Sequence, residues 1–406
     1  MPEKKNSLLR YLVITEKFPP RKGGSNTTFD AVYRRLGDRT THIIANAQPG
    51  GSEFDAGHPN TVHRLNLNRQ SWIRPESLGI YIKLLFKSLW LVFIHRFDAV
   101  HAGRVLSEGL VGLLVARLRG LPLVIWAHGE EITSWRQPLK FRVMAFTYRH
   151  ADRILANSEF TRDELLKLGV IPEKIKLIYP GVDVDIFRPG LPTKDLRTSL
   201  GLGDEQRLIL SVGRLTRRKS FDQVVRALVR LVEEGVDVHY VIVGIGEDES
   251  YLKQLAVEEG VSERVHLLGH VPMEDLPRWY CAADLFAMPN RNVNNDTEGF
   301  GKVYIEASAC GRPAIAGMAG GTGAAVLDGV TGLRVDGESL EAVTNGLRLL
   351  LNDTKLARRL GEQGRRRAVE SFSWEQVAKQ KELVFREMQK KSRAFPAETA
   401  HNRLRK

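Results

Sequence analysis

Strand-like and helix-like segments alternate along most of this chain, in two successive sets. The first set contains six expected strands, Tyr11–Thr15, Thr41–Ala45, Ala99–His101, Leu123–Trp126, Arg153–Ala156 and Ile175–Tyr179. The second set contains five, Arg207–Val212, His239–Val243, Val265–Leu268, Leu285–Met288 and Pro313–Ala316. Strands separated by helices indicate parallel sheets that are covered on both faces. We therefore expect an α/β protein with two doubly wound parallel-sheet domains that face each other across a cleft.

The expected helices and one linker divide the chain further. Helical periodicity covers eight segments, Ser107–Arg119, Ser158–Leu168, Ser220–Glu234, Glu249–Glu258, Asp275–Ala282, Lys302–Cys310, Leu340–Leu351 and Asp353–Val369. A linker with two prolines, Tyr179–Pro189, separates the two sets, and Ser373–Gln389 predicts a last helix. The expected parts are domains at residues 1–188 and 189–370, a C-terminal helix at 371–390 and a disordered basic tail at 391–406.

Composition fits a globular protein of two ordinary domains. The chain has 406 residues, with 43% hydrophobic and 27% charged residues. Its two cysteines, Cys281 and Cys310, exclude a disulfide framework and belong to no metal-type cluster, which fits a reducing compartment. Met1–Arg10 is charged and leads directly into a strand, so no signal peptide is visible and we expect a cytoplasmic location.

The positive charge lies mainly in the first half. The net charge is +12, and residues 1–190 hold 28 Lys and Arg against 18 Asp and Glu, a difference of +10. Segment Ile80–Ile94 is apolar with helical periodicity, too short to span a bilayer. Two interpretations stay open: a solvated basic surface with an ordinary packed helix, or contact with an anionic membrane on the inner face of the plasma membrane. No nucleic-acid-binding motif is present, so we expect no nucleic-acid partner.

Two acids flank a Gly-rich helix start. Glu298 precedes Phe300, Gly301 and Lys302, and Glu306 lies about one turn into the helix that follows. A loop that opens a helix presents main-chain N–H groups and a positive dipole end, which suit a phosphate. Acids on either side can bind hydroxyl groups, so the order of groups matches a nucleotide-sugar. The alternative is a surface loop with two solvated acids.

Cations and glycines stand at the ends of other expected strands. Strand Arg207–Val212 is followed by Arg214 and Lys219, whose charges suit a diphosphate, although four basic residues within six positions blur which ones act. Gly23 and Gly24 follow the first strand and allow close approach of a ligand. His128 follows Leu123–Trp126 and is a site candidate, although a lone histidine is more often structural.

Two further motifs argue against other chemistry. Gly244 and Gly246 resemble the start of a dinucleotide-binding fingerprint, but the third glycine is missing, so a nicotinamide site is not expected. Asp183 and Asp185 form an acid pair within the linker, which we interpret as structural. We therefore expect neither a metal nor another cofactor.

Together these motifs resemble the retaining glycosyltransferases of family 4, whose GT-B fold pairs two Rossmann-like domains. The resemblance covers nearly the whole chain, and a finer match to the phosphatidylinositol mannosyltransferase branch is weak. The matching motifs are Gly23-Gly24, His128-Gly129-Glu130, Gly181-Val182-Asp183 with Phe187-Arg188-Pro189, Gly213-Arg214 with Lys219, Glu298 to Glu306 with Gly311 and Pro313, and Phe372-Ser373-Trp374. The last of these would begin a helix that crosses back to the first domain.

The resemblance implies a role for each matching position. Glu306 would bind the ribose, Glu298 the donor sugar, and His128 the sugar or its reacting carbon. Arg214 and Lys219 would neutralise the leaving diphosphate. The remaining implied contacts are main-chain amides near Phe300, Gly301 and Lys302 with those of Gly23 and Gly24, the neighbouring Val303, and packing of the base near Gly244, Gly246 and Val271. The implied catalytic group is therefore His128, Arg214, Lys219 and Glu298.

The implied function is transfer of a hexose from a nucleotide-diphosphate sugar, GDP-mannose or a UDP-sugar, to a lipid-linked or saccharide acceptor. Such a reaction serves glycolipid, exopolysaccharide or lipopolysaccharide synthesis. The acceptor is expected at loops Gly50–Arg74 and Gly103–Gly109. One departure concerns Thr322–Ala325, where the family usually has an acid, which puts the identity of the donor in doubt. The alternatives are a sugar phosphorylase or nucleotide-sugar epimerase on this fold, or a non-enzymatic nucleotide-binding protein.

Overall fold

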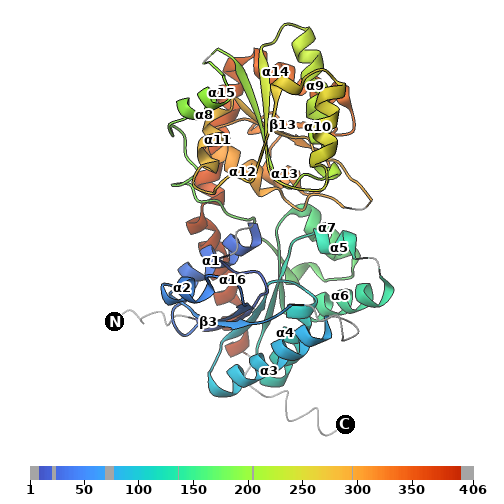
Figure 1. Ribbon diagram of the computed structural model, residues 1–406. Coiled ribbons are helices and arrows are strands. Elements are labelled where there is room, and N and C mark those ends of the chain that lie inside the picture. The colour runs from blue at the N-terminus through green and yellow to red at the C-terminus, as the bar shows by residue number, and fades with distance from the viewer. Residues whose placement is uncertain are drawn as a thin grey trace.

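The protein folds into two domains, one above the other in Figure 1. The computed structural model describes residues 9–20, 24–68, 77–135, 137–203, 205–294 and 296–394. Each domain has one parallel sheet. The lower, N-terminal sheet has the strand order β3-β2-β1-β4-β5-β6-β7, and the upper, C-terminal sheet has the order β10-β9-β8-β11-β12-β13. The order reverses beside β1 and β8, so the predicted α/β, doubly wound fold is confirmed.

The N-terminal sheet is buried on both faces. Its strands are β1 (Tyr11–Ile14), β2 (His42–Asn46), β3 (Thr61–Leu65), β4 (Ala99–Ala102), β5 (Leu123–Ala127), β6 (Arg153–Ala156) and β7 (Ile175–Leu177). Successive side chains of a strand point to opposite faces. Leu12 and Ile14 accordingly belong to one apolar cluster, and Tyr11 and Val13 to another.

Helices cover these two faces. The helices of this domain are α1 (Gly24–Leu36), α2 (Gly51–Ala56), α3 (Leu78–Ile94), α4 (Ser107–Arg119), α5 (Glu130–Ser134), α6 (Pro138–His150) and α7 (Glu159–Lys167), with the short η1 (Pro172–Lys174). The cluster around Leu12 includes side chains of α3, α4, α6 and α7, and the cluster around Tyr11 includes side chains of α1. The helix α4 has the predicted bounds, because its apolar period and its αL cap at Gly120 mark both ends.

The C-terminal domain repeats this plan around one large core. Its strands are β8 (Arg207–Val212), β9 (Val238–Val243), β10 (Val265–Gly269), β11 (Leu285–Met288), β12 (Ala314–Gly317) and β13 (Gly332–Val335). Its helices are α8 (Lys194–Ser199), η2 (Arg217–Lys219), α9 (Phe221–Glu233), α10 (Glu249–Glu258), η3 (Ser262–Arg264), α11 (Leu276–Ala282), α12 (Lys302–Ala309), α13 (Thr322–Ala325), α14 (Leu340–Asn352), α15 (Thr354–Arg367) and the π-helical η4 (Ala368–Phe372).

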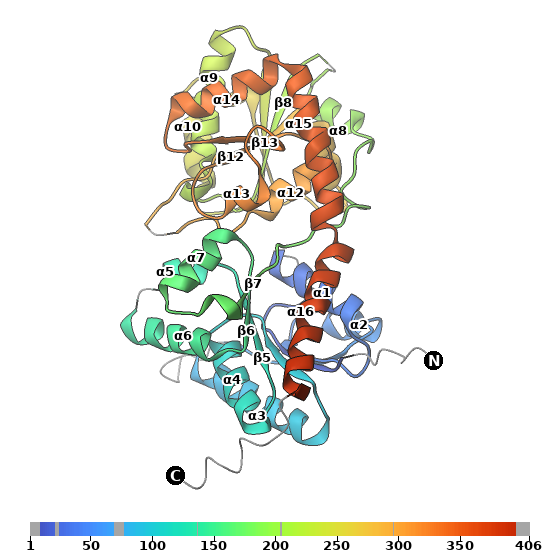
Figure 2. The same cartoon turned by 180° about the vertical axis from the view of Figure 1, so that it is seen from behind.

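The last helix, α16 (Trp374–Ala394), leaves the C-terminal domain and packs against the N-terminal one. Figure 2 shows it descending beside α1. Its side chains Val377 and Phe385 join the cluster around Tyr11, and the ring centroids of Tyr11 and Phe385 lie 5.4 Å apart. The helix extends past the predicted boundary at residue 390, and residues 395–406 of the predicted tail lie outside the described residues.

Two expectations about elements were wrong. The strands β3 and β13 were not predicted, and the expected acceptor loop Gly50–Arg74 contains α2 and β3, with residues 69–74 outside the described part. Both missed strands lie at the edge of a sheet and carry polar side chains, which weakens the apolar pattern. Within the described residues, no helix combines the length and the apolarity needed to cross a bilayer.

Candidate functional site

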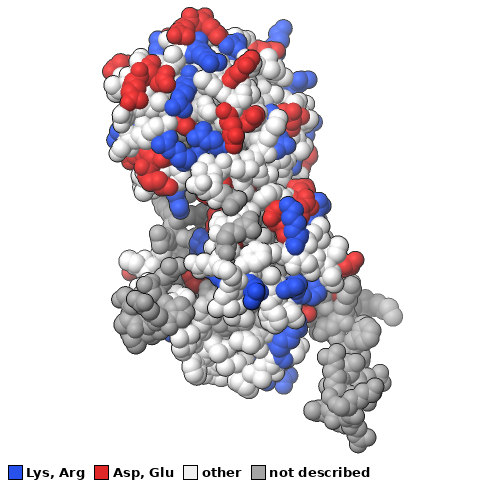
Figure 3. Space-filling model, turned by 90° about the vertical axis from the view of Figure 1, so that its right-hand side faces the viewer, with Lys and Arg blue, Asp and Glu red and all other residues white. Residues whose placement is uncertain are grey.

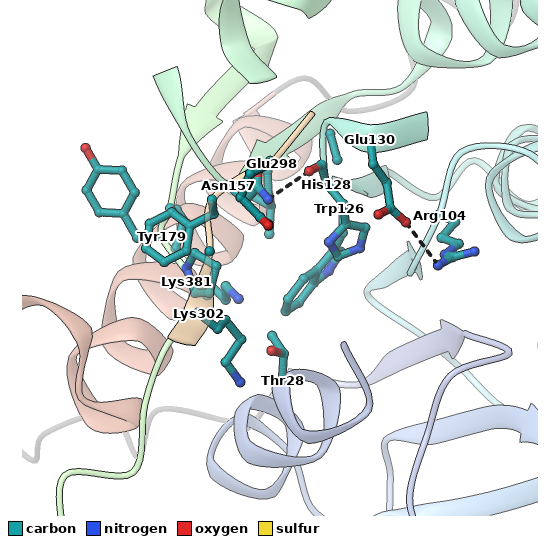
Figure 4. A pocket seen from close by; sticks show the side chains of 17 residues that line it. Thr28, Arg104, Trp126, His128, Glu130, Asn157, Tyr179, Glu298, Lys302 and Lys381 are labelled. Carbon is teal, nitrogen blue, oxygen red and sulfur yellow. Dashed lines mark hydrogen bonds and ion pairs between the residues drawn. The ribbon is translucent and has the colours of Figure 1, made fainter. Parts of the chain in front are cut away.

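A pocket of about 230 Å³ opens between the two domains. Figure 4 shows side chains from both domains converging on it. The N-terminal domain contributes the start of α1, the end of β5 and the loop after it, and the C-terminal domain contributes Glu298 to Lys302. The pocket therefore lies where the carboxyl ends of both sheets meet, as expected for ligand sites of this architecture.

Glu298 is held by two cations from the loop after β8. The ammonium of Lys219 donates to Glu298 Oε2, and Arg218 Nη1 donates to the same oxygen at 2.9 Å. These contacts lower the pKa of Glu298 to about 2, although burial alone would raise it. Glu298 is therefore ionised and fixed in place, with Lys219 only 10% exposed in its side chain.

Arg214, predicted beside Lys219, lies elsewhere on the same loop. Its side chain is exposed, and the arginine that pairs with Glu298 is Arg218. The charge of Arg214 acts on Lys17 of the N-terminal domain, where it helps burial and Arg104 to lower the lysine pKa. Arg214 therefore faces the first domain across the cleft.

The helix start after Glu298 has the predicted form. Gly301 precedes α12 with a φ of 85°, a left-handed conformation that suits glycine. The next residues, Lys302 and Val303, are half-buried in the first turn. One turn later Glu306 accepts a hydrogen bond of 3.0 Å from the Tyr280 hydroxyl, and burial raises its pKa.

Phe300 is a packing residue. It is 2% exposed, and its ring stacks at 5.9 Å on Tyr179 of the linker. It also meets Phe372 edge to face at 5.9 Å. Its side chain thus packs the start of α12 against the linker, so that its main chain is the part placed to meet a ligand.

His128 is held by the loop after β4. Its Nε2 lies 3.0 Å from the carbonyl oxygen of Gly103, so Nε2 carries the proton. Burial lowers the pKa of His128, against the opposing charge of Glu131. The neutral ring then keeps a lone pair on Nδ1, which can accept a hydrogen bond from a hydroxyl group.

The two domains touch beside this histidine. Ser158 Oγ of the N-terminal domain donates to the carbonyl oxygen of Gly299 at 2.7 Å, and Asn157 Nδ2 donates to that of His128 at 2.9 Å. A Cβ on Gly299 would overlap the main-chain oxygen of His128. This close contact between the domains places the loop that carries Glu298 against the loop that carries His128.

The remaining predicted ligand contacts lie in both domains, at the start of α1 and beside the loop after β8. Gly23 lies outside the described residues, and Gly24 begins α1. Gly244 and Gly246 belong to the segment after β9, which pairs with the loop after β8 through bonds such as Leu215 N to Ile245 O at 3.1 Å. Val271 is half-buried against the core of its domain. Gly244 and Gly246 thus border the loop that carries Arg214 and Lys219.

The acid pair of the linker is structural, as predicted. Asp183 Oδ1 accepts hydrogen bonds of 3.1 Å from the main-chain N–H groups of Asp185 and Ile186. Among the described residues, no group of three or more His, Cys, Asp or Glu side chains is arranged to hold a metal ion.

Known proteins of similar sequence identify the family. The profile of Glycosyltransferase Family 4 matches residues 22–186, and that of Glycosyl transferases group 1 matches residues 192–367. A GDP-mannose-dependent alpha-(1-6)-phosphatidylinositol monomannoside mannosyltransferase of Mycolicibacterium smegmatis is 32% identical over 369 residues, with 89% of this chain and 94% of the relative covered. The chain belongs to glycosyltransferase family 4. It is a glycosyltransferase, as predicted.

Other relatives agree. A D-inositol 3-phosphate glycosyltransferase of Catenulispora acidiphila is 34% identical over 278 residues, with 63% of this chain and 64% of the relative covered. HepE of Anabaena, solved with UDP, has a TM-score of 0.79 at 21% identity over 93% of this chain and all of that one. Sucrose-phosphate synthase of Thermosynechococcus elongatus has a TM-score of 0.74 at 23% identity, covering 94% and 99%. The predicted GT-B fold is confirmed.

The candidate site contains residues that the sequence did not single out. Arg218 is one of four basic residues within six positions, so the sequence could not show which of them pairs with Glu298. Lys381 of α16 lines the pocket although it lies far from every recognised motif. One signal could have revealed it: Lys381 occupies a position in the buried stripe of α16, between Val377 and Phe385, where an apolar residue is expected.

Proposed function

We propose that this enzyme transfers a hexose from a nucleotide-diphosphate sugar to a lipid-linked or saccharide acceptor, with retention of configuration. The names of the relatives support a nucleotide-sugar donor, since one is GDP-mannose-dependent and HepE was solved with UDP. They also support an inositol-containing acceptor, because the relatives act on phosphatidylinositol monomannoside or D-inositol 3-phosphate. Because the chain belongs to a family of glycosyltransferases, the alternative of a non-enzymatic nucleotide-binding protein is excluded.

The observation that carries the proposal is the arrangement of Glu298 between Lys219 and Arg218 at the start of α12. Departure of a nucleoside diphosphate places negative charge on its outer phosphate and positive charge on the sugar. The cations and the helix start can stabilise the first charge, and the ionised Glu298 can accept hydrogen bonds from sugar hydroxyls. These groups are already in place, so we propose a reaction that needs no metal ion.

A binding screen and product analysis test the proposal. Thermal shift should reveal GDP or UDP, since a ligand at about a hundred times its Kd stabilises by about 2.7 kcal/mol. Product analysis then separates a transferase, which releases the nucleoside diphosphate together with a glycosylated acceptor, from a phosphorylase or epimerase. Retention of activity by Glu298→Ala and Lys219→Ala would remove this site from the mechanism.

The surface of α3 supports a lipid-linked acceptor and contact with a membrane. Four large apolar side chains on α3 are each half-exposed or more: Phe86, Trp90, Phe93 and Ile94. The neighbouring α4 adds the exposed Leu114 and Leu118. We call these six residues the α3–α4 face. In Figure 3 much of the visible lower part of the N-terminal domain is uncharged, whereas acidic and basic side chains are interspersed over the C-terminal domain.

Basic side chains accompany the α3–α4 face. Lys87 Nζ lies 4.0 Å from the ring centroid of Trp90, and the Arg119 guanidinium lies 5.1 Å from that of Phe93. Aromatic side chains with adjacent cations match the boundary of an anionic bilayer, where rings enter the headgroup region and cations meet phosphate. A face with six exposed large apolar side chains is uncommon on a protein surface that contacts only water.

Vesicle flotation tests this surface. The intact protein should bind vesicles that contain phosphatidylglycerol and bind neutral phosphatidylcholine vesicles less. Phe86→Ser with Phe93→Ser should weaken the binding at least about tenfold, because two large apolar groups leave the interface. Val257→Ser, which removes an exposed apolar side chain of α10 in the other domain, is the matched control. Equal binding of all variants would refute the membrane contact.

A further inference from the structure

A lysine from the last helix reaches the floor of the pocket. Lys381 of α16 is only 2% exposed, and its Nζ lies 3.5 Å from the ring centroid of Trp126. Figure 4 shows its amine pointing into the pocket, with Lys302, Thr28 and Trp126 around the same space. The two amines come from different domains, since Lys302 opens α12 and Lys381 packs with the N-terminal domain.

These two amines have no acidic hydrogen-bonding partner among the described residues. Lys302 Nζ lies 3.3 Å from Thr27 Oγ1 and 5.1 Å from the ring centroid of Trp374. Lys381 is in contact with the face of Trp126 and makes no hydrogen bond or ion pair within the described part of the chain. Burial lowers the pKa of both lysines; the charge of Glu306 opposes this at Lys302, whereas the charge of Lys302 lowers the pKa of Lys381 further. Two amine groups therefore face one space, and a positive charge on one disfavours a positive charge on the other.

Such an arrangement is unfavourable in the free protein. Burying the Lys381 ammonium group without a counter-charge is unfavourable, and an apolar side chain at this position of α16 would avoid the cost. Contact with the Trp126 ring offsets part of it. An anion between the amines would remove both the desolvation penalty and the repulsion. Thr28, near the start of α1, adds a hydroxyl group on the same side of the pocket.

We propose that Lys381 and Lys302 form an anion-binding subsite that takes a phosphate group of a substrate. This subsite is distinct from the cations of the loop after β8, because its amines come from α12 and α16, whereas Arg218 and Lys219 contact Glu298. The phosphate belongs either to the acceptor or to the donor. The proposal rests on the proposed function only for the identity of that substrate, since phosphate binding itself can be measured without catalysis.

Thermal shift on the full chain tests the subsite with inorganic phosphate as the probe. The wild-type Tm should rise with phosphate concentration by about 2 °C or more. Lys381→Met and Lys302→Met, which keep the length of the side chain, should each weaken phosphate binding at least tenfold. Lys379→Met removes an exposed charge from the same helix and should respond as the wild type does. This control also accounts for the general stabilising effect of phosphate salts.

A second arm with GDP and UDP identifies the source. If the two variants lose the phosphate response but keep the nucleotide response, the subsite takes a phosphate of the acceptor. If they lose both, it takes the diphosphate of the donor. A wild-type phosphate response without any nucleotide response would contradict the proposed donor and leave the subsite intact.

Two results would overturn the subsite. One is an unchanged phosphate response of Lys381→Met, and the other is an equal loss in Lys379→Met. Unliganded Lys381→Met should be at least as stable as the wild type, because a buried charge has been removed. If that variant fails to fold, Lys302→Met carries the test, because it lies on the other domain.

Discussion

The contact between Lys219 and Glu298 allows a quantitative test of how the site is held together. Glu298 has its pKa lowered to about 2 from an ordinary 4.5, which corresponds to about 3 kcal/mol of stability at pH 7. Because the folded pKa is the lower one, this contribution is present above about pH 4.5 and is lost as the pH falls through about 2. Lys219 and Arg218 both contribute to this stabilisation of the Glu298 carboxylate, so removing one cation should cost less than removing the carboxylate.

Glu298→Gln should cost about 3 kcal/mol, because it leaves the buried ammonium group of Lys219 without its counter-charge, whereas Arg218 keeps its ion pair with Asp296. Lys219→Met should cost less, about 2 kcal/mol, because Arg218 still holds the carboxylate. The double variant should be less destabilised than the sum of the two by at least about 1 kcal/mol, since the groups are in direct contact. Lys253→Met, which breaks an exposed pair with Glu249, should change stability by less than about 0.5 kcal/mol.

Urea unfolding at pH 7 measures all four variants, and a series between pH 3 and 7 follows the proton linkage. The wild type should lose stability with acid more steeply than Glu298→Gln does, because below about pH 4.5 only the unfolded wild type takes up a proton at this carboxyl group. If the change in unfolding free energy of the double variant equals the sum of the two single changes within about 0.5 kcal/mol, Lys219 and Glu298 are not coupled. A Glu298→Gln variant as stable as the wild type would refute the buried-pair reasoning altogether.

Three further outcomes follow from the pocket and its surroundings. Burial raises the pKa of Glu108 to about 8. The protonated carboxyl group therefore contributes fully to stability below about pH 4.5, and this contribution is lost as the pH rises through about 8. Between pH 6 and 9 the wild-type Tm should fall more than that of Glu108→Gln. Gly299→Ala should reduce kcat/KM and cost about 1–3 kcal/mol, whereas Gly203→Ala, where the new methyl group meets open space, should do neither. Ser158→Ala should cost about 1 kcal/mol more in urea unfolding than Ser339→Ala, because both remove a helix cap but only Ser158 bonds the other domain; equal costs would mean that this bond contributes nothing.

The sequence predicted the central strands better than the edges. β8 and β11 have the predicted bounds, because a strand buried on both faces is a continuous apolar run between polar residues. β3 contains Thr61, His63 and Arg64, and β13 contains Arg334, so neither forms such a run. Their position follows from pairing with β2 and β12, which is a long-range effect that no local pattern carries.

The candidate site was predictable where one motif forms one local structure. Glu298, Gly301 and the start of α12 lie as the local pattern indicates. The partner of Glu298 was not predictable, because several cations share the loop and only the fold brings Arg218 to it. Lys381 required the return of α16 to the first domain, 83 residues after Glu298 along the sequence.

The return of α16 has a consequence for biosynthesis. Strand β1 begins at Tyr11, whose side chain packs against Phe385 as well as against α1, so part of this apolar face is covered only by the last part of the chain. During synthesis the part of this face that α16 covers stays exposed while the second domain emerges and folds. Contacts of such large sequence separation slow folding and leave apolar surface exposed to other chains. A nascent chain that stops before Trp374 should therefore depend on chaperones, even though most of its first domain is complete.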